Sequence, residues 1–207
     1  MVLKFLMNYP FVIGLVTILL MLSDYFLTLI QEKERRAHYA KHYQSYPINT
    51  IEGNPAFQES VSKLKILNPK HLIATLVIGI GIPFFLFFIP AIFREIFLGY
   101  VWGLFLIVIT QHLSNLIGYR VSRKGVHGKL LLHQRTGLLI QSGRYLSTAL
   151  FLLILSILSE SQIIYGVTIA GFTSALRLFI LSKKAAPIEK DNLPPKNIIV
   201  DNLNTIE

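Results

Sequence analysis

Five long apolar runs constrain this chain more than any other feature. They lie at about 9–30, 72–93, 96–118, 138–158 and 162–182. Each run is long enough to cross about 30 Å of hydrocarbon at about 1.5 Å per helical residue. A helix satisfies its own backbone hydrogen bonds inside a bilayer, which an open strand or loop does not. We therefore predict an all-α, polytopic integral membrane helical bundle of about five transmembrane helices.

The composition agrees with a membrane protein. Of the 207 residues, 53% are hydrophobic and only 15% are charged, whereas soluble domains carry about 25% charged residues. The formal net charge of +9 is also typical of nucleic-acid-binding proteins. Here the positive charges gather between the apolar runs, so we predict membrane lipids as partners and no nucleic acid. The absence of cysteine excludes disulfide and thiolate chemistry.

The distribution of Lys and Arg predicts an orientation. Basic residues are frequent in the first loop (31–71), in the third loop and in the tail. The short turns after the second and fourth runs contain one Arg and none, respectively. Because cytoplasmic loops retain Lys and Arg, this alternation predicts an external N-terminus and a cytoplasmic C-terminus.

The chain divides into a membrane domain (1–182) and a tail (183–207). The tail contains three prolines and several Asn and Lys residues, so we predict that it is disordered. Within the first loop, Asn54-Pro55 is a helix-start signal, and we predict a short interfacial helix there. A second such signal, Asn68-Pro69, should begin the second span.

Glycine and proline mark two further features of the spans. The second span contains Gly79, Gly81, Pro83 and Pro90, which predicts a kink or an interruption. Small residues recur every four positions in the third span and in the fifth, a pattern typical of close helix packing. These residues are Gly99 and Gly103 in the third span, and Gly166, Ala170 and Ser174 in the fifth.

Polar residues within the spans concentrate near their predicted cytoplasmic ends. Asp24 lies six residues before the end of the first run, or about 9 Å inside it. Three other spans carry strongly polar residues at similar depth, which predicts a polar cavity open to the cytoplasm. Its candidate members are Asp24, Thr28, His112, Asn115, Arg144 and Arg177.

The charges of this group suggest a ligand. Asp24 can pair with one of the two arginines, Arg144 and Arg177, which leaves one positive charge for an anion. The alternative is that both arginines extend to lipid head groups and that His112 is only a hydrogen-bonding residue. The short side chain of Asp24 cannot extend to the lipid head groups, so we favour a functional or site-organising role for it.

Two motifs resemble a known signature. Asp24-x-x-x-Thr28 followed by Glu52-x-Asn54-Pro55 is similar to the pattern of small prokaryotic membrane proteins of uncharacterised function. The resemblance implies that Asp24, Thr28, Glu52 and Asn54 work together in a prokaryotic plasma membrane, and it implies no reaction. The alternative for the second motif is a simple turn and helix start.

Three functions follow as hypotheses. The first is binding or transport of an anionic lipid head group or small solute. The second is a membrane-embedded enzyme acting on a lipid or polyprenyl substrate, with Asp24 or Glu52 as base or metal ligand and the two arginines holding phosphate. A divalent metal held by Asp24, Glu52 and His112 is compatible with their chemistry but not required by it. The third is a structural subunit that packs against another membrane protein or a second copy.

Overall fold

The structure, a computed structural model, describes residues 9–37, 43–45, 50–125, 130–132 and 134–185. Five of its helices are long and apolar enough to cross a membrane, which confirms the predicted all-α polytopic bundle. They are α2 (Pro10–Ala37), α4 (Pro69–Leu86), α5 (Ala91–Gly125), α6 (Gln134–Ser159) and α7 (Gln162–Lys184). A short helix, α3 (Pro55–Ser62), lies between α2 and α4 in the chain. The tail predicted to be disordered lies outside the described residues from 186 onward.

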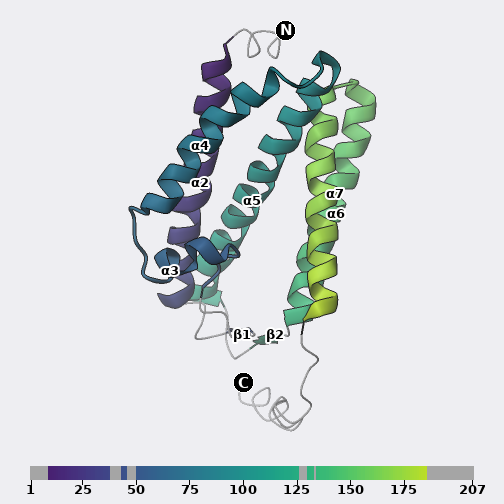
Figure 1. Cartoon of the computed structure of the whole chain (residues 1–207). Helices are drawn as coiled ribbons and strands as arrows, with labels where there is room; N and C mark the ends of the chain where they lie inside the picture. Colours follow the sequence, from purple (N-terminus) through teal and green to yellow (C-terminus); the bar gives the residue numbers. More distant parts are fainter. Residues whose placement is uncertain (1–8, 38–42, 46–49, 126–129, 133, 186–207) are drawn as a thin grey trace, which may run out of the picture.

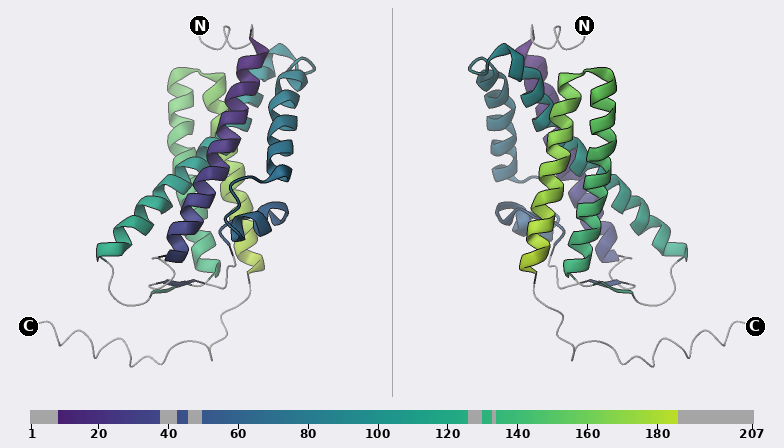
Figure 2. Two further views of the ribbon diagram at one scale, coloured as in Figure 1. Left: turned by 90° about the vertical axis from the view of Figure 1, so that its left-hand side faces the viewer. Right: turned by 90° about the vertical axis from the view of Figure 1, so that its right-hand side faces the viewer.

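Helix α5 joins the two halves of the bundle. It packs against α2 and against α7, while α4 covers α2 and α6 covers α7. Figure 1 shows α5 in the middle, with α2 and α4 on one side and α6 and α7 on the other. The start of α2 and the end of α7 lie at opposite ends of the bundle (Figure 2), as an odd number of spans requires.

Two short strands, which the sequence did not predict, pair at the end of the bundle. Strand β1 (Tyr43–Ser45) pairs in parallel with β2 (Leu130–Leu132). The pairing connects the first loop to the third, at the end where α2 terminates (Figure 1).

The second span differs from its predicted bounds of 72–93. Helix α4 ends at Leu86 and α5 begins at Ala91, so the turn lies at 87–90 rather than around Arg94. Pro90 explains the break, because proline lacks an N–H group and pushes the preceding residue out of the helical conformation. Arg94 instead lies in the first turn of α5, where its Nε donates to the Ile89 carbonyl at 2.9 Å. Helix α4 is continuous through Gly79, Gly81 and Pro83, so the predicted interruption lies at the turn before Pro90 and not within the helix.

Both predicted helix starts in the first loop are confirmed. Oδ1 of Asn54 accepts the Ala56 N–H at 3.1 Å, and Oδ1 of Asn68 accepts the Lys70 N–H at 3.1 Å. Such caps satisfy backbone donors that the first helical turn leaves unpaired. Helix α3 is then anchored by Val61, which is fully buried against Tyr25 and Leu29 of α2.

The small residues of α5 and α7, for which close helix packing was predicted, pack against each other. A Cβ atom added at Gly99 would lie 2.1 Å from the Ile163 carbonyl oxygen, and one added at Gly166 would lie 2.1 Å from that of Ile96. Neither position has space for a side chain, so the two backbones are in direct contact. This contact sets the position of α7 relative to α5.

Candidate functional site

A cavity of about 790 Å³ lies where α2, the loop at 50–54, α3, α5, α6 and α7 come together. Seven of the eight residues predicted for the site line it: Asp24, Thr28, Glu52, Asn54, His112, Asn115 and Arg177. The lining residues of α2 belong to its second half, so the cavity occupies the end of the bundle beside α3 (Figure 1). This is the end that the basic loops predict to be cytoplasmic.

Arg144 is the predicted residue that does not line the cavity. It is exposed on α6, whereas Gln141 and Tyr145 of the same helix are lining residues. Successive helical residues are rotated by about 100°, so Arg144 faces away from the direction that its neighbour Tyr145 takes. Its position fits the alternative in which a side chain near a span end extends to lipid head groups.

His112 organises the polar contacts at the cavity. Its Nε2 lies 3.0 Å from Asp24 Oδ1 and 3.0 Å from Thr28 Oγ1. Its Nδ1 is hydrogen-bonded to Gln31 Oε1, and Gln31 Nε2 donates to the Tyr119 hydroxyl at 3.4 Å. Asp24, Thr28 and Gln31 are four and three residues apart, which places them along one face of α2. Helices α2 and α5 are therefore linked by a chain of side-chain contacts.

The hydrogen-bond inventory assigns roles to these groups. An amide oxygen only accepts, so the Gln31 contact places a hydrogen on Nδ1 of His112. The Thr28 hydroxyl donates to the Asp24 backbone carbonyl at 2.8 Å, so toward Nε2 of His112 it can only accept, from a hydrogen on Nε2. Both ring nitrogens of His112 are thus engaged within the protein.

Asp24 is more accessible than the imidazole that contacts it. Its Oδ1 atom is buried and accepts no hydrogen bond from the described residues, although Nε2 of His112 is close enough for an ion pair. The side chain as a whole is 30% exposed. His112, whose side chain is 13% exposed, therefore positions Asp24, which is the more accessible of the two groups.

The Glu52–Pro55 motif forms a turn and also lines the cavity. Glu52 Oε1 accepts the Asn54 N–H at 2.7 Å, and Gln58 donates to the Glu52 carbonyl at 3.1 Å. Burial raises the pKa of the Glu52 carboxyl, the Asn54 N–H opposes this, and the charge of Asp24 raises the pKa further. The two interpretations of this motif, helix start and site component, are compatible.

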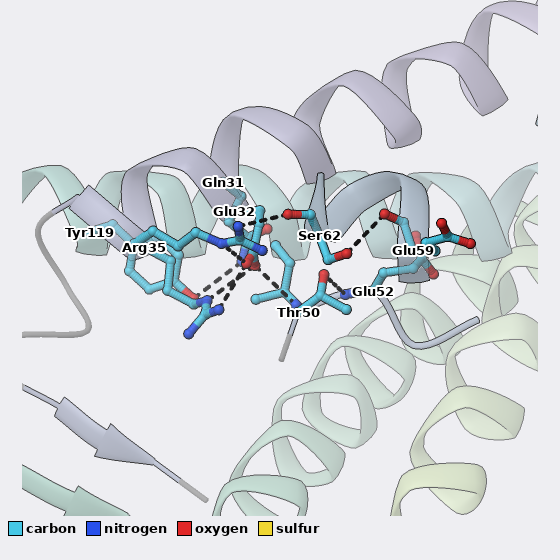
Figure 3. Close-up of polar contacts among 10 residues, drawn as sticks. Gln31, Glu32, Arg35, Thr50, Glu52, Glu59, Ser62 and Tyr119 are labelled. Atoms are coloured by element: carbon cyan, nitrogen blue, oxygen red, sulfur yellow. Dashed lines mark hydrogen bonds and ion pairs between the residues drawn. The ribbon is translucent and has the colours of Figure 1, made fainter. Parts of the chain in front are cut away.

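A buried carboxylate, Glu32, fixes this loop and was missed by the sequence analysis (Figure 3). Its fully buried side chain accepts from Arg35 Nη2 at 2.8 Å, Arg36 Nε at 2.5 Å and the Ile51 N–H at 3.0 Å. Arg36 Nη1 also donates to the Ser62 carbonyl at 2.7 Å, at the end of α3. The spacing of Glu32 from its two arginines is visible in the sequence as helical i,i+3 and i,i+4 pairs. Nothing in the sequence indicated that the loop would bind the same carboxylate.

The cavity is also lined by uncharged polar side chains that were not predicted as site residues. These are Gln31, Thr50, Gln58, Gln111, Tyr119, Gln141, Tyr145 and Ser174. They supply hydrogen-bond donors and acceptors around the charged groups. The lining residues that belong to the spans share one feature visible in the sequence: they lie at a similar depth, near the ends of their helices.

No metal-binding group of three or more His, Cys, Asp or Glu residues occurs among the residues that the structure describes. Asp24 and Glu52 both line the cavity with His112, yet the three do not converge as ligands of one ion. The geometry thus gives the metal hypothesis no support.

The chain matches no family model, no curated protein and no solved structure. The function is therefore inferred from the cavity itself.

Proposed function

We propose that this is a membrane-embedded binding protein whose cavity takes a polar lipid head group or a small polar solute from the predicted cytoplasmic side. One observation carries the proposal: a cavity of about 790 Å³ among the helices, with charged and amide side chains on its walls. Ligand pockets typically have volumes of about 300–1,000 Å³.

The placement of polar groups supports binding rather than a purely structural role. A carboxylate in a membrane span is costly and is normally found where it faces a polar cavity or a partner. Asp24 meets both conditions, since it lines the cavity and contacts His112. A structural subunit would be expected to hold Asp24 in a dry helix interface.

Binding is also favoured over transport. At the opposite end of α2, Ile13 is fully buried and packs with Ile82, Leu86 and Leu98 from α4 and α5. This apolar cluster lies between α2, α4 and α5, away from the polar cavity, and offers no groups to replace the hydration of a solute.

A substitution that fills the cavity tests the proposal. Ser174 lines the cavity, whereas Ser147 is exposed on α6 and outside it. Native mass spectrometry of the purified protein should detect a bound small molecule, which Ser174→Trp displaces and the matched variant Ser147→Trp retains. If both variants hold the same molecule, or the parent protein holds none, the cavity is not a binding site.

A specific observation also favours an enzyme acting on a lipid or polyprenyl substrate. His112 holds the Asp24 carboxylate at the cavity, where Asp24 is suited to act as a general base. Arg177 lines the same cavity and can stabilise a phosphate group. Incubation with phospholipids or polyprenyl phosphate should then yield a product that Asp24→Asn abolishes. Equal yields from both proteins would exclude this role for Asp24.

A further inference from the structure

The charges on the cavity walls are separated by sign. Asp24 of α2 and Glu52 of the loop at 50–54 are acidic, and that loop is tied to α2 through Glu32. The basic residue Arg177 belongs to α7. Helices α2 and α7 stand on either side of α5 (Figures 1 and 2). The cavity thus has an acidic wall and a basic wall.

These charges are incompletely matched within the part of the chain that the structure describes. Asp24 contacts the imidazole of His112, and no ion pair between Arg177 and a described carboxylate occurs. The Glu52 carboxylate accepts hydrogen bonds from backbone N–H groups, and no Lys or Arg side chain among the described residues pairs with it. Pairing stabilises charged groups near hydrocarbon, so an occupant that supplies both signs would complete the site, although Arg177 is exposed and also accessible to water.

We propose that the cavity binds a zwitterion, with an ammonium group at Asp24 and Glu52 and a phosphate or carboxylate group at Arg177. This inference rests on the proposed binding function and specifies its ligand. A primary ammonium offers three N–H donors for the two carboxylates. The guanidinium of Arg177 is suited to a bidentate contact with an anionic group.

Simple ions fit the lining less well. An anion alone would satisfy Arg177 and lie close to two carboxylates, and a cation alone would leave Arg177 unmatched. The anion predicted from the sequence depended on two arginines, Arg144 and Arg177, against one carboxylate. Arg144 lies outside the cavity and Glu52 lines it, so the Asp, Glu, Lys and Arg side chains of the lining are two acidic residues, Asp24 and Glu52, and one basic residue, Arg177.

The ammonium–phosphate pair has two natural sources, an aminophospholipid and a free solute, and binding assays distinguish them. The full-length protein in nanodiscs should retain phosphatidylethanolamine at least about tenfold more tightly than phosphatidylglycerol, which lacks the ammonium group. Phosphatidylcholine, whose trimethylated nitrogen has no N–H, should also bind more weakly. Comparable affinity for soluble phosphoethanolamine identifies a solute site, and binding of the lipid alone identifies a head-group site.

Two variants and a matched control test the assigned contacts. Arg177→Gln and Asp24→Asn should each weaken phosphatidylethanolamine binding about tenfold or more, as expected when a charged hydrogen-bond partner is lost. Arg144→Gln removes an equivalent charge outside the cavity and should leave the affinity unchanged. If Asp24→Asn does not fold, Glu52→Gln tests the acidic wall in its place.

The outcomes separate this inference from the proposed function. A bound molecule that Ser174→Trp displaces, together with equal affinity for phosphatidylglycerol and phosphatidylethanolamine, would overturn the zwitterion and leave the binding function intact. Unchanged phosphatidylethanolamine affinity in Arg177→Gln would overturn it as well. Absence of any displaceable molecule would overturn the proposed function itself.

Discussion

Glu52 is held where its negative charge is unfavourable. Burial raises the pKa of its carboxyl above the ordinary value of 4.5, and the nearby charge of Asp24 acts in the same direction. The folded protein therefore binds a proton at Glu52 more tightly than the unfolded chain does. Stability contributed by this residue is present below pH 4.5 and is lost as the pH rises from there through the raised pKa.

We predict that Glu52→Gln stabilises the protein at neutral and higher pH. Glutamine keeps an oxygen for the Asn54 N–H and removes the charge, so the gain is about 1.4 kcal/mol for each unit by which the pKa is raised. Thermal unfolding in detergent should show the advantage shrinking as the pH falls toward 4.5. Glu59→Gln is the control, because Glu59 is exposed and its ion pair with Lys63 lowers its pKa. A Glu52→Gln protein less stable than the parent at pH 8 would contradict the prediction.

The residue scale also shows what sequence could predict. Charge distribution gave the depth of each polar group, and depth was enough to select Asp24, His112 and Arg177. It was not enough for Arg144, because depth says nothing about the direction in which a helical residue faces. Glu32 was missed for another reason: its contact with the Ile51 N–H joins residues 19 apart through a loop.

At the scale of elements, one carboxylate holds the loop that forms a wall of the cavity. Glu32 binds two arginines of α2 and the backbone of the loop, and Arg36 reaches the end of α3.

Local signals predicted where α3 and α4 begin, because an Asn cap and a proline act within one helical turn. The pairing of β1 with β2 and the end of α4 were not predictable in the same way. The strands are three residues long and distant in sequence, and the apolar run continues through 87–89 beyond the helix.

We predict that Glu32→Ala releases the loop at 50–52 from α2. The Ile51 N–H loses its charged acceptor, which is worth about 1.5–3 kcal/mol, so its hydrogen exchange should accelerate about tenfold to a hundredfold. Amide hydrogen exchange measured by mass spectrometry on peptides containing residue 51 tests this. Glu59→Ala removes an exposed carboxylate of α3 and should leave that exchange rate unchanged. An equal rate in Glu32→Ala and the parent would show that the loop is held by other contacts.

At the scale of the whole molecule, α5 is the element on which both sides of the cavity depend. It carries His112, which meets α2, and Gly99, whose backbone touches α7. Sequence periodicity predicted five spans and small-residue packing faces, since both are local patterns. Which helices would pack together depends on contacts between residues far apart in the chain, and the pattern alone did not contain that information.

The orientation of the bundle decides from which side the cavity is reached. The basic loops predict that α3 and the cavity face the cytoplasm and that the turn between α6 and α7 is external. Because the chain has no cysteine, single cysteines can be labelled without background. Ser161→Cys, in that turn, should react with a membrane-impermeant maleimide on intact cells, whereas Glu59→Cys on α3 should react only after permeabilisation. The reverse pattern would place the cavity on the outer face, and its ligand would then come from outside the cell.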